Sequence, residues 1–154
     1  MTDIRPVPDD VPLPAFLRAA RTTYGSAMRA ALAEAGCDDI PGNGMFVIGA
    51  LARFGTPLSQ IIRDLRVTKQ AAGQLVDTLV LRGYLERDVD PADRRRLTLT
   101  LTERGKAAAE AQRSAVDQVD VELLKRVGPD YIAHTRATLG ALIEMQREAE
   151  VEPA

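Results

Sequence analysis

The sequence is poor in aromatic residues, cysteine and histidine, and each shortage excludes a class of protein. Its 154 residues include no Trp, three Tyr, three Phe, one Cys and one His. A single cysteine cannot form a disulfide within the chain, and one Cys with one His is a poor set of metal ligands. No apolar run approaches the roughly 18 residues of a membrane span, and the first residues lack the basic-then-apolar pattern of a secretory signal. We therefore expect a cytoplasmic protein without a metal, a cofactor or a membrane segment.

What the sequence does contain favours one helical domain with an uneven charge. Apolar residues make up 45% of the chain and charged residues 27%, with abundant Ala, Leu and Arg. The net charge of -2 hides a basic centre, because residues 53–106 hold 11 Lys or Arg against 7 Asp or Glu. The position of charge matters more than its sum for association with DNA. The basic centre of the chain and its acidic ends are therefore expected to have different functions.

Apolar residues recur at helical spacing along most of the chain. An arm of residues 1–12, rich in Pro and Asp, is expected to precede the helices. The expected helices run over about 14–34, 45–53, 60–65, 68–82, 102–127 and 129–150, and all but the third and fourth, which Arg66-Val67 connects, are separated by segments that contain Gly or Pro. Thr68 and Thr102 are the expected N-caps of two of them, and Ser59 or Thr56 that of the short third helix. The third and fourth helices, joined by a brief turn, follow the plan of a helix-turn-helix.

Residues 85–102 read as a β-hairpin with a basic tip. Leucines and threonines alternate strictly over 97–102, which is typical of a half-buried strand. An Asp-Pro turn at 90–91 separates this strand from the preceding one, and three arginines follow at 94–96. Concentrated positive charge suits the phosphates and negative potential of a DNA groove.

Two motifs in this region resemble the MarR (multiple antibiotic resistance regulator) family of transcription factors. The first is Asp93-Arg94-Arg95 followed by LTLTERG at 99–105, which is similar to the family's wing signature of Asp-x-Arg, a strand and Leu-Thr-x-x-Gly. The second is RVTKQA at 66–71, followed by LVDTL at 75–79 and RGYLER at 82–87. The layout of nearly the whole chain agrees with this resemblance.

The resemblance implies a mainly α fold with a small β-hairpin wing. A winged helix-turn-helix over about 45–101 would be flanked by dimerisation helices at about 14–35 and 102–150, all within one domain of residues 13–154. The long helices exceed what is needed to cover so small a unit, and such apolar stripes usually pack on another subunit. A homodimer would place recognition helix 68–82 in the major groove and wing 88–97 at the minor groove.

Several residues are candidates for contact with double-stranded DNA. The exposed start and outer face of the recognition helix carry Thr68, Lys69, Gln70, Gly73 and Gln74. Gln can pair with adenine, Lys can bind guanine or phosphate, and Thr can contact phosphate or a thymine methyl. Gly73 and Gln74 depart from the common family pattern, which is consistent with a closer helix approach or with weaker binding.

The three wing arginines, at 94–96, are expected to have different roles. The resemblance pairs Asp93 with Arg95 as a brace, which leaves Arg94 or Arg96 to enter a minor groove. Repulsion within this cluster is screened by solvent and offset by nearby Asp residues, so charge alone does not require a partner. Further phosphate contacts, or plain surface solubility, are open for Arg53, Arg63 and Arg66.

The remaining candidates have a packing explanation of equal or greater weight. An effector pocket lined by Tyr24, Met28, Met45 and Phe46 is one interpretation, and core packing is the other. Cys37 adjoins two aspartates that disfavour its reactive thiolate, so a packed cysteine is favoured over a redox sensor. His134 is expected at a helix surface or an interface.

The chain is thus predicted to be a sequence-specific DNA-binding regulator, a dimeric repressor released by a small-molecule effector. A winged module that binds protein and has weakened DNA binding is the alternative. No nucleophile with a base and an orienting group can be assembled, so an enzyme is not expected.

Overall fold

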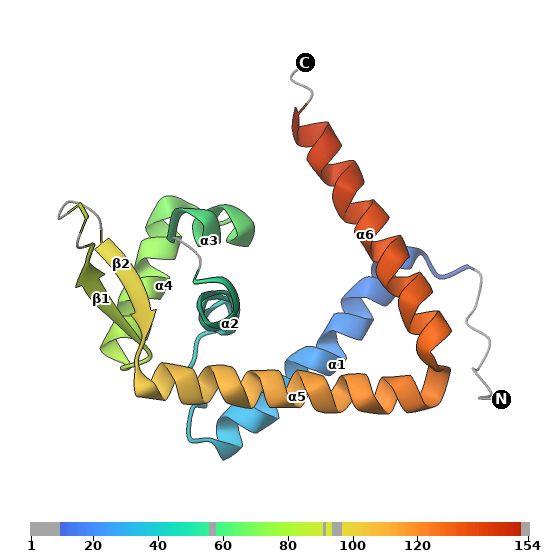
Figure 1. The fold of residues 1–154 in the computed structure, drawn as a ribbon, viewed down its shortest axis with the longest axis horizontal. Helices are drawn as coiled ribbons and strands as arrows, with labels where there is room; N and C mark the ends of the chain where they lie inside the picture. Colours follow the sequence, from blue (N-terminus) through green and yellow to red (C-terminus); the bar gives the residue numbers. More distant parts are fainter. Residues whose placement is uncertain (1–9, 56–57, 91, 94–96, 152–154) are drawn as a thin grey trace.

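The structure, a computed structural model, describes residues 10–55, 58–90, 92–93 and 97–151. Its elements in chain order are α1 (Leu13–Glu34), α2 (Gly44–Phe54), α3 (Leu58–Leu65), α4 (Lys69–Leu81), β1 (Leu85–Val89), β2 (Leu97–Leu101), α5 (Glu103–Val127) and α6 (Pro129–Val151). A module formed by α2, α3, α4 and the β1–β2 hairpin lies over the first part of α5 (Figure 1). Helix α5 continues beyond this module, α1 crosses it, and α6 turns back from its far end. The mainly helical fold with a small hairpin is confirmed.

Local sequence signals explain where the main helices begin and end. The Thr68 side chain accepts a hydrogen bond from the Ala71 amide at 3.1 Å, and that of Thr102 accepts one from Gly105 at 3.0 Å. Both therefore satisfy an amide that the first helical turn leaves unpaired, as predicted. The expectation that Ser59 caps α3 is wrong, because the helix already begins at Leu58 and Ser59 lies inside its first turn. The alternative cap, Thr56, lies outside the described residues.

The predicted hairpin is present, with β1 and β2 antiparallel. Leu85 faces Leu101, Arg87 faces Leu99 and Val89 faces Leu97 in the register. Leu85 is buried, whereas the other four residues of β1 are exposed. Strand β1 therefore joins the core through Leu85, while Leu99 and Leu101 of β2 are partly buried against it.

The hydrophobic core lies within the winged module and where it meets α5. Its most deeply buried large side chains come from α2, α3, α4, the turn after α4 and the start of β1: Val47, Ile48, Ile61, Leu79, Tyr84 and Leu85. Ala108 of α5 also belongs to this core and packs against these side chains. The small module thus has a continuous apolar interior, which holds α4 in place.

The long helices are packed on one side only. Helix α1 lies against α5, where the Tyr24 hydroxyl donates to the Asp120 carboxylate at 2.5 Å. The distal half of α5 and α6 leaves seven large apolar side chains exposed: Val121, Leu123, Leu124, Tyr131, Leu142, Ile143 and Met145. These residues, called the apolar row, follow one another along the two helices and lie on more than one face of each helix. Within the described residues, none of the helices has the length and apolar character to cross a membrane.

Candidate nucleic-acid interface

Helix α4 presents a polar face to solvent. Lys69, Gln70 and Gln74 are exposed, while Ala72, Val76 and Leu79 hold the opposite face in the core. The Thr68 cap leaves the helix start open, where amide groups and the helix dipole favour an anion such as phosphate. Amide and ammonium groups on an open helix face are suited to donating and accepting hydrogen bonds at base edges.

Gly73 lies at the side of this polar face. A methyl group at this position would meet no other atom of the described residues within 4 Å. Packing inside the chain therefore does not require a glycine here, although glycine costs up to about 1 kcal/mol against Ala within a helix. Nothing within this single chain explains the choice.

Two features of α4 were missed by the sequence reasoning. Asp77 of α4 forms an ion pair with Arg87 of β1, so the recognition helix is linked to the hairpin by charge. Leu81, in the last turn of α4, is 87% exposed. The spacing of Gln70, Gln74 and Leu81 places all three on one helix face, which is the signal that could have revealed it.

The wing arginines Arg94, Arg95 and Arg96 lie outside the described residues. Asp93 is described and exposed. The predicted brace between Asp93 and Arg95, and the choice of the arginine that probes a groove, therefore stay predictions.

The other arginines singled out in the sequence have partners within the chain. Arg53 lies over the Phe54 ring at 5.8 Å from its centroid, and Arg63 donates to Gln60 of its own helix. Arg66, whose φ of +52° marks the turn between α3 and α4, forms an ion pair of 3.3 Å with Glu150 of α6. Each of these contacts is exposed and can exchange for a phosphate.

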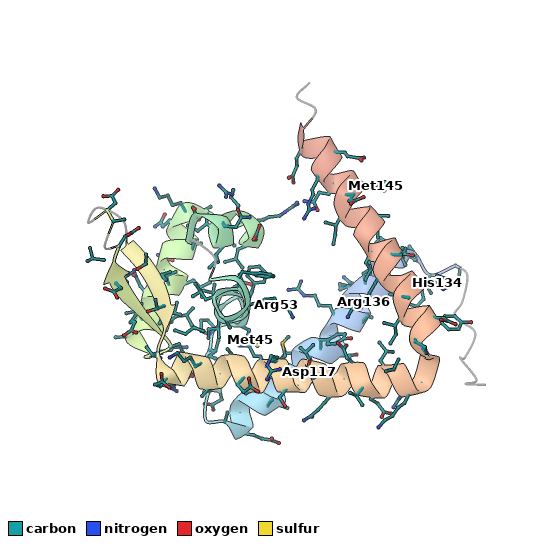
Figure 2. The ribbon with its side chains drawn as sticks, viewed as in Figure 1. Met45, Arg53, Asp117, His134, Arg136 and Met145 are labelled. Carbon is teal, nitrogen blue, oxygen red and sulfur yellow. The ribbon has the colours of Figure 1, made fainter. Side chains whose placement is uncertain are left out.

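A cleft of about 660 Å³ separates α1 from the α1–α2 loop and the start of α2. Tyr24, Met28 and Met45 of the predicted effector pocket line it, whereas Phe46 does not and is 45% exposed. Its further lining includes three cationic side chains of α1, Arg18, Arg21 and Arg29. Figure 2 shows Met45 where α2 meets α5. The cleft therefore combines an apolar floor with a positively charged rim.

Cys37 and His134 occupy different surroundings. Cys37 is 3% exposed and lines the cleft beside Asp38. His134 is exposed on α6, far from the winged module (Figure 2). Within the described part of the chain, no group of three or more His, Cys, Asp or Glu residues is placed to hold a metal ion.

A polar junction behind α4 was also missed. The Tyr84 hydroxyl donates to the Asp39 carboxylate, and this hydrogen bond holds the pKa of Asp39 below its ordinary value. Burial, followed by the same hydrogen bond, raises the pKa of Tyr84. Arg104 completes the junction with a 3.2 Å ion pair to Asp39. These residues are far apart in the sequence, and no spacing pattern connects them.

The family comparison places this geometry among known proteins. The sequence model of the MarR family matches residues 38–96, which cover α2 to α4 and the hairpin up to its tip. Over these residues the chain is similar to the MarR family, and the structure there has the helices and hairpin of a winged helix. The predicted resemblance to the MarR family is confirmed.

Solved structures extend the MarR fold to the whole chain. FabT of Streptococcus pneumoniae, solved in complex with DNA, is 20% identical with a TM-score of 0.74, covering 89% of this chain and 96% of FabT. MarR itself is 18% identical with a TM-score of 0.72, covering 95% of this chain and 98% of MarR. BpsR of Bordetella bronchiseptica, whose DNA binding is regulated by 6-hydroxynicotinic acid, is 19% identical with a TM-score of 0.57, covering 97% of this chain and 100% of BpsR. No curated protein matches the chain in sequence.

Proposed function

We propose that this MarR-fold chain is a transcriptional regulator that binds double-stranded DNA as a homodimer and acts as a repressor. The observation that carries the proposal is the exposed polar face of α4, held on a buried core beside a hairpin. The central charge excess over residues 53–106 supports the same assignment. The FabT complex with DNA shows that a similar fold can bind a duplex.

The exposed apolar row on α5 and α6 supports the dimer. Val121, Tyr131, Ile143 and Met145 are each more than half exposed. Side chains of this size, gathered on helices that reach beyond the module, favour burial against a second copy. A two-fold dimer would present two α4 helices to successive major grooves, about 34 Å apart.

Each α4 would read bases with the side chains of Gln70 and Gln74 and would contact phosphate through Lys69. The arginines at 94–96 would add contacts at the minor groove. Bidentate contacts to base edges provide about 1–3 kcal/mol of discrimination each, whereas phosphate contacts provide affinity that falls with salt.

The cleft beside α1 is the proposed effector site. Its rim arginines favour an anion, and its Tyr24, Met28 and Met45 floor favours an apolar or aromatic body. A small aromatic acid has both properties, and the regulation of BpsR by such an acid offers a precedent in this fold. Binding there would release the repressor if the DNA-bound arrangement closed the cleft.

Selection of duplexes from a random pool, followed by gel-shift titration at low salt, tests DNA binding. Gln70→Ala and Gln74→Ala should each lower the affinity of the protein for the selected duplex and relax its sequence preference. Gln118→Ala, an exposed glutamine of α5, is the matched control and should change neither. Replacing Arg94, Arg95 and Arg96 by Ala should lower affinity and reduce the salt slope by roughly one per lost phosphate contact. Failure to select any duplex at low salt would exclude this function.

A protein-binding winged module is the second candidate, and the exposed Leu81 favours it. An apolar side chain that is 87% exposed on α4 suits a protein surface better than a polar groove. Stoichiometric DNA binding with a sequence preference would exclude this candidate.

A further inference from the structure

Arg104 joins three segments that are distant in the sequence. From the first turn of α5, its guanidinium donates to the Arg82 carbonyl at 2.7 Å and to the Gly36 carbonyl at 3.3 Å. The same group pairs with the Asp39 carboxylate at 3.2 Å, and its central carbon lies 4.4 Å from the centre of the Tyr84 ring. One side chain therefore connects the end of the recognition helix, the α1–α2 loop and the start of α5.

The Arg82 contact is made at the C-terminal end of α4. Arg82 is the C-cap residue, and carbonyl groups at this end of a helix lack partners within it. A cation that donates to such a carbonyl is also favoured by the helix dipole. The Arg82 side chain donates to the Asp39 carbonyl, so the end of α4 is hydrogen-bonded both to the α1–α2 loop and to Arg104 of α5.

The backbone around the junction leaves little freedom. The Thr102 amide donates to the Tyr84 carbonyl at 3.1 Å, and the Thr102 hydroxyl donates to the Gly83 carbonyl at 2.5 Å. A Cβ on Gly105 would overlap the Tyr84 carbonyl oxygen, so α5 approaches this backbone as closely as a glycine permits. Arg104 itself is different, because its side chain is 43% exposed and fills no part of the core.

We infer that Arg104 is a positioning residue that fixes the angle between recognition helix α4 and the long helices. This inference rests on the proposed function, because a dimer reads two half-sites only when the separation of its α4 helices is fixed. The hydrogen bonds that the structure records for the Arg104 guanidinium all go to acceptors within the chain, at Arg82, Gly36 and Asp39. Arg104 acts through α4 and makes no phosphate contact itself.

Half-site spacing gives the test that a merely structural role would not affect. Duplexes selected with the wild type are remade with one base pair added or removed between the half-sites. The wild type should discriminate strongly between these spacings. Arg104→Gln should bind the selected duplex about tenfold more weakly, because α4 is then held less rigidly. It should also lose most of the discrimination between half-site spacings. Its salt slope should equal that of the wild type, because no phosphate contact is lost.

Two matched variants accompany it. Arg104→Lys keeps the charge but lacks the planar fork that serves several acceptors, so it should rescue only part of the discrimination. Arg113→Gln removes an exposed arginine of the same helix, paired with Glu110, and should behave as the wild type. Unchanged spacing discrimination in Arg104→Gln, or a salt slope lower by about one, would overturn the inference.

A distance measurement tests the same inference without DNA. Spin labels are attached to cysteines placed at Gln74 and Gln118 in a Cys37→Ala chain, diluted with unlabelled protein. The wild type should give one narrow distance distribution, and Arg104→Gln a clearly broader one, whereas equal widths would overturn the inference. If Arg104→Gln does not fold by circular dichroism, Asp39→Asn, which removes the ion pair of Arg104 with the Asp39 carboxylate, takes its place in both experiments. Absence of DNA binding by the wild type would count against the proposed function, and the label distances would still decide the role of Arg104.

Discussion

The winged module buries its large apolar side chains, whereas the distal long helices leave many of theirs exposed. In the module, Ile48, Leu79 and Tyr84 are completely buried. On α6, Ile143 is 53% exposed and Met145 63% exposed. Both regions are helical, but among the described residues only the module buries large side chains completely.

This difference separates the part of the chain that has its own core from the part that we propose packs against a second copy. Burial of large side chains supplies most of the favourable free energy of folding, so the module can hold α4 in a fixed shape. The distal helices instead expose several large apolar side chains, whose burial against a partner would be favourable. The module therefore has a core of its own that holds α4, whereas the distal helices leave apolar side chains for the proposed dimer interface to cover.

The largest expected effect comes from charging the apolar row. Ile143→Glu would bury an unpaired carboxylate in the proposed interface, so the chain should become monomeric. Loss of the linked second half-site should weaken operator binding by about a hundredfold or more. Sedimentation velocity and gel-shift titration measure the two effects.

Phe54→Glu is the control for this change. Phe54 is 72% exposed on α2, away from the row, and its charge variant should remain dimeric. A dimeric Ile143→Glu protein with normal DNA affinity would show that the row is not the interface.

The next effect sharpens the contrast within a single helix. Leu79→Ala should lower the free energy of unfolding by about 2–5 kcal/mol, because it leaves a cavity in the module core. Leu81→Ala, two residues along α4 and 87% exposed, should change it by less than about 0.5 kcal/mol. Urea unfolding followed by circular dichroism measures both, and equal losses would contradict the burial described for α4.

A smaller effect concerns pH at the joint between the regions. The hydrogen bond from Tyr84 lowers the pKa of Asp39 below its ordinary 3.8, so the folded state favours the ionised carboxylate. This contribution is present above that ordinary value and is lost as the pH falls through the lower pKa of the folded state. Asp39→Asn should therefore lower the melting temperature at neutral pH, and the difference from the wild type should shrink in acid. A difference that grows as the pH falls would contradict the assigned direction.

The smallest effect tests the contact that reaches from α6 to the module. Glu150→Gln breaks the exposed pair with Arg66 and frees that arginine for phosphate, so DNA affinity should rise. Exposed pairs contribute at most about 1 kcal/mol, which limits the gain to roughly fivefold. Glu148→Gln makes the same charge change on an exposed neighbour and should produce a smaller gain. Equal gains in the two variants would mean that general charge, not the Arg66 contact, is responsible.

Sequence alone predicted the parts of the fold that depend on local chemistry. The caps at Thr68 and Thr102 and the alternation over 97–102 each express a rule that acts within a few residues. Ser59 failed as a cap because a serine before an apolar turn fits either the cap or the first turn, and the difference is one or two residues.

The candidate site was predictable only in part. The polar face of α4 follows from helical periodicity, but the Arg104 junction does not. Its acceptors lie 22, 68 and 65 residues away along the chain, at Arg82, Gly36 and Asp39. In the sequence, Arg104 is one of several charged residues at the start of a helix and cannot be distinguished from a solvent-exposed arginine. Only the tertiary fold brings its three acceptors together.

The stoichiometry of the complex with a selected duplex is the most direct test of the central claim. Sedimentation equilibrium of the protein with one labelled operator duplex gives the number of chains bound. Two chains on a site with two related half-sites is the predicted result. One chain per duplex, or no complex at low salt, would contradict the account of a winged module made into a regulator by a second copy of itself.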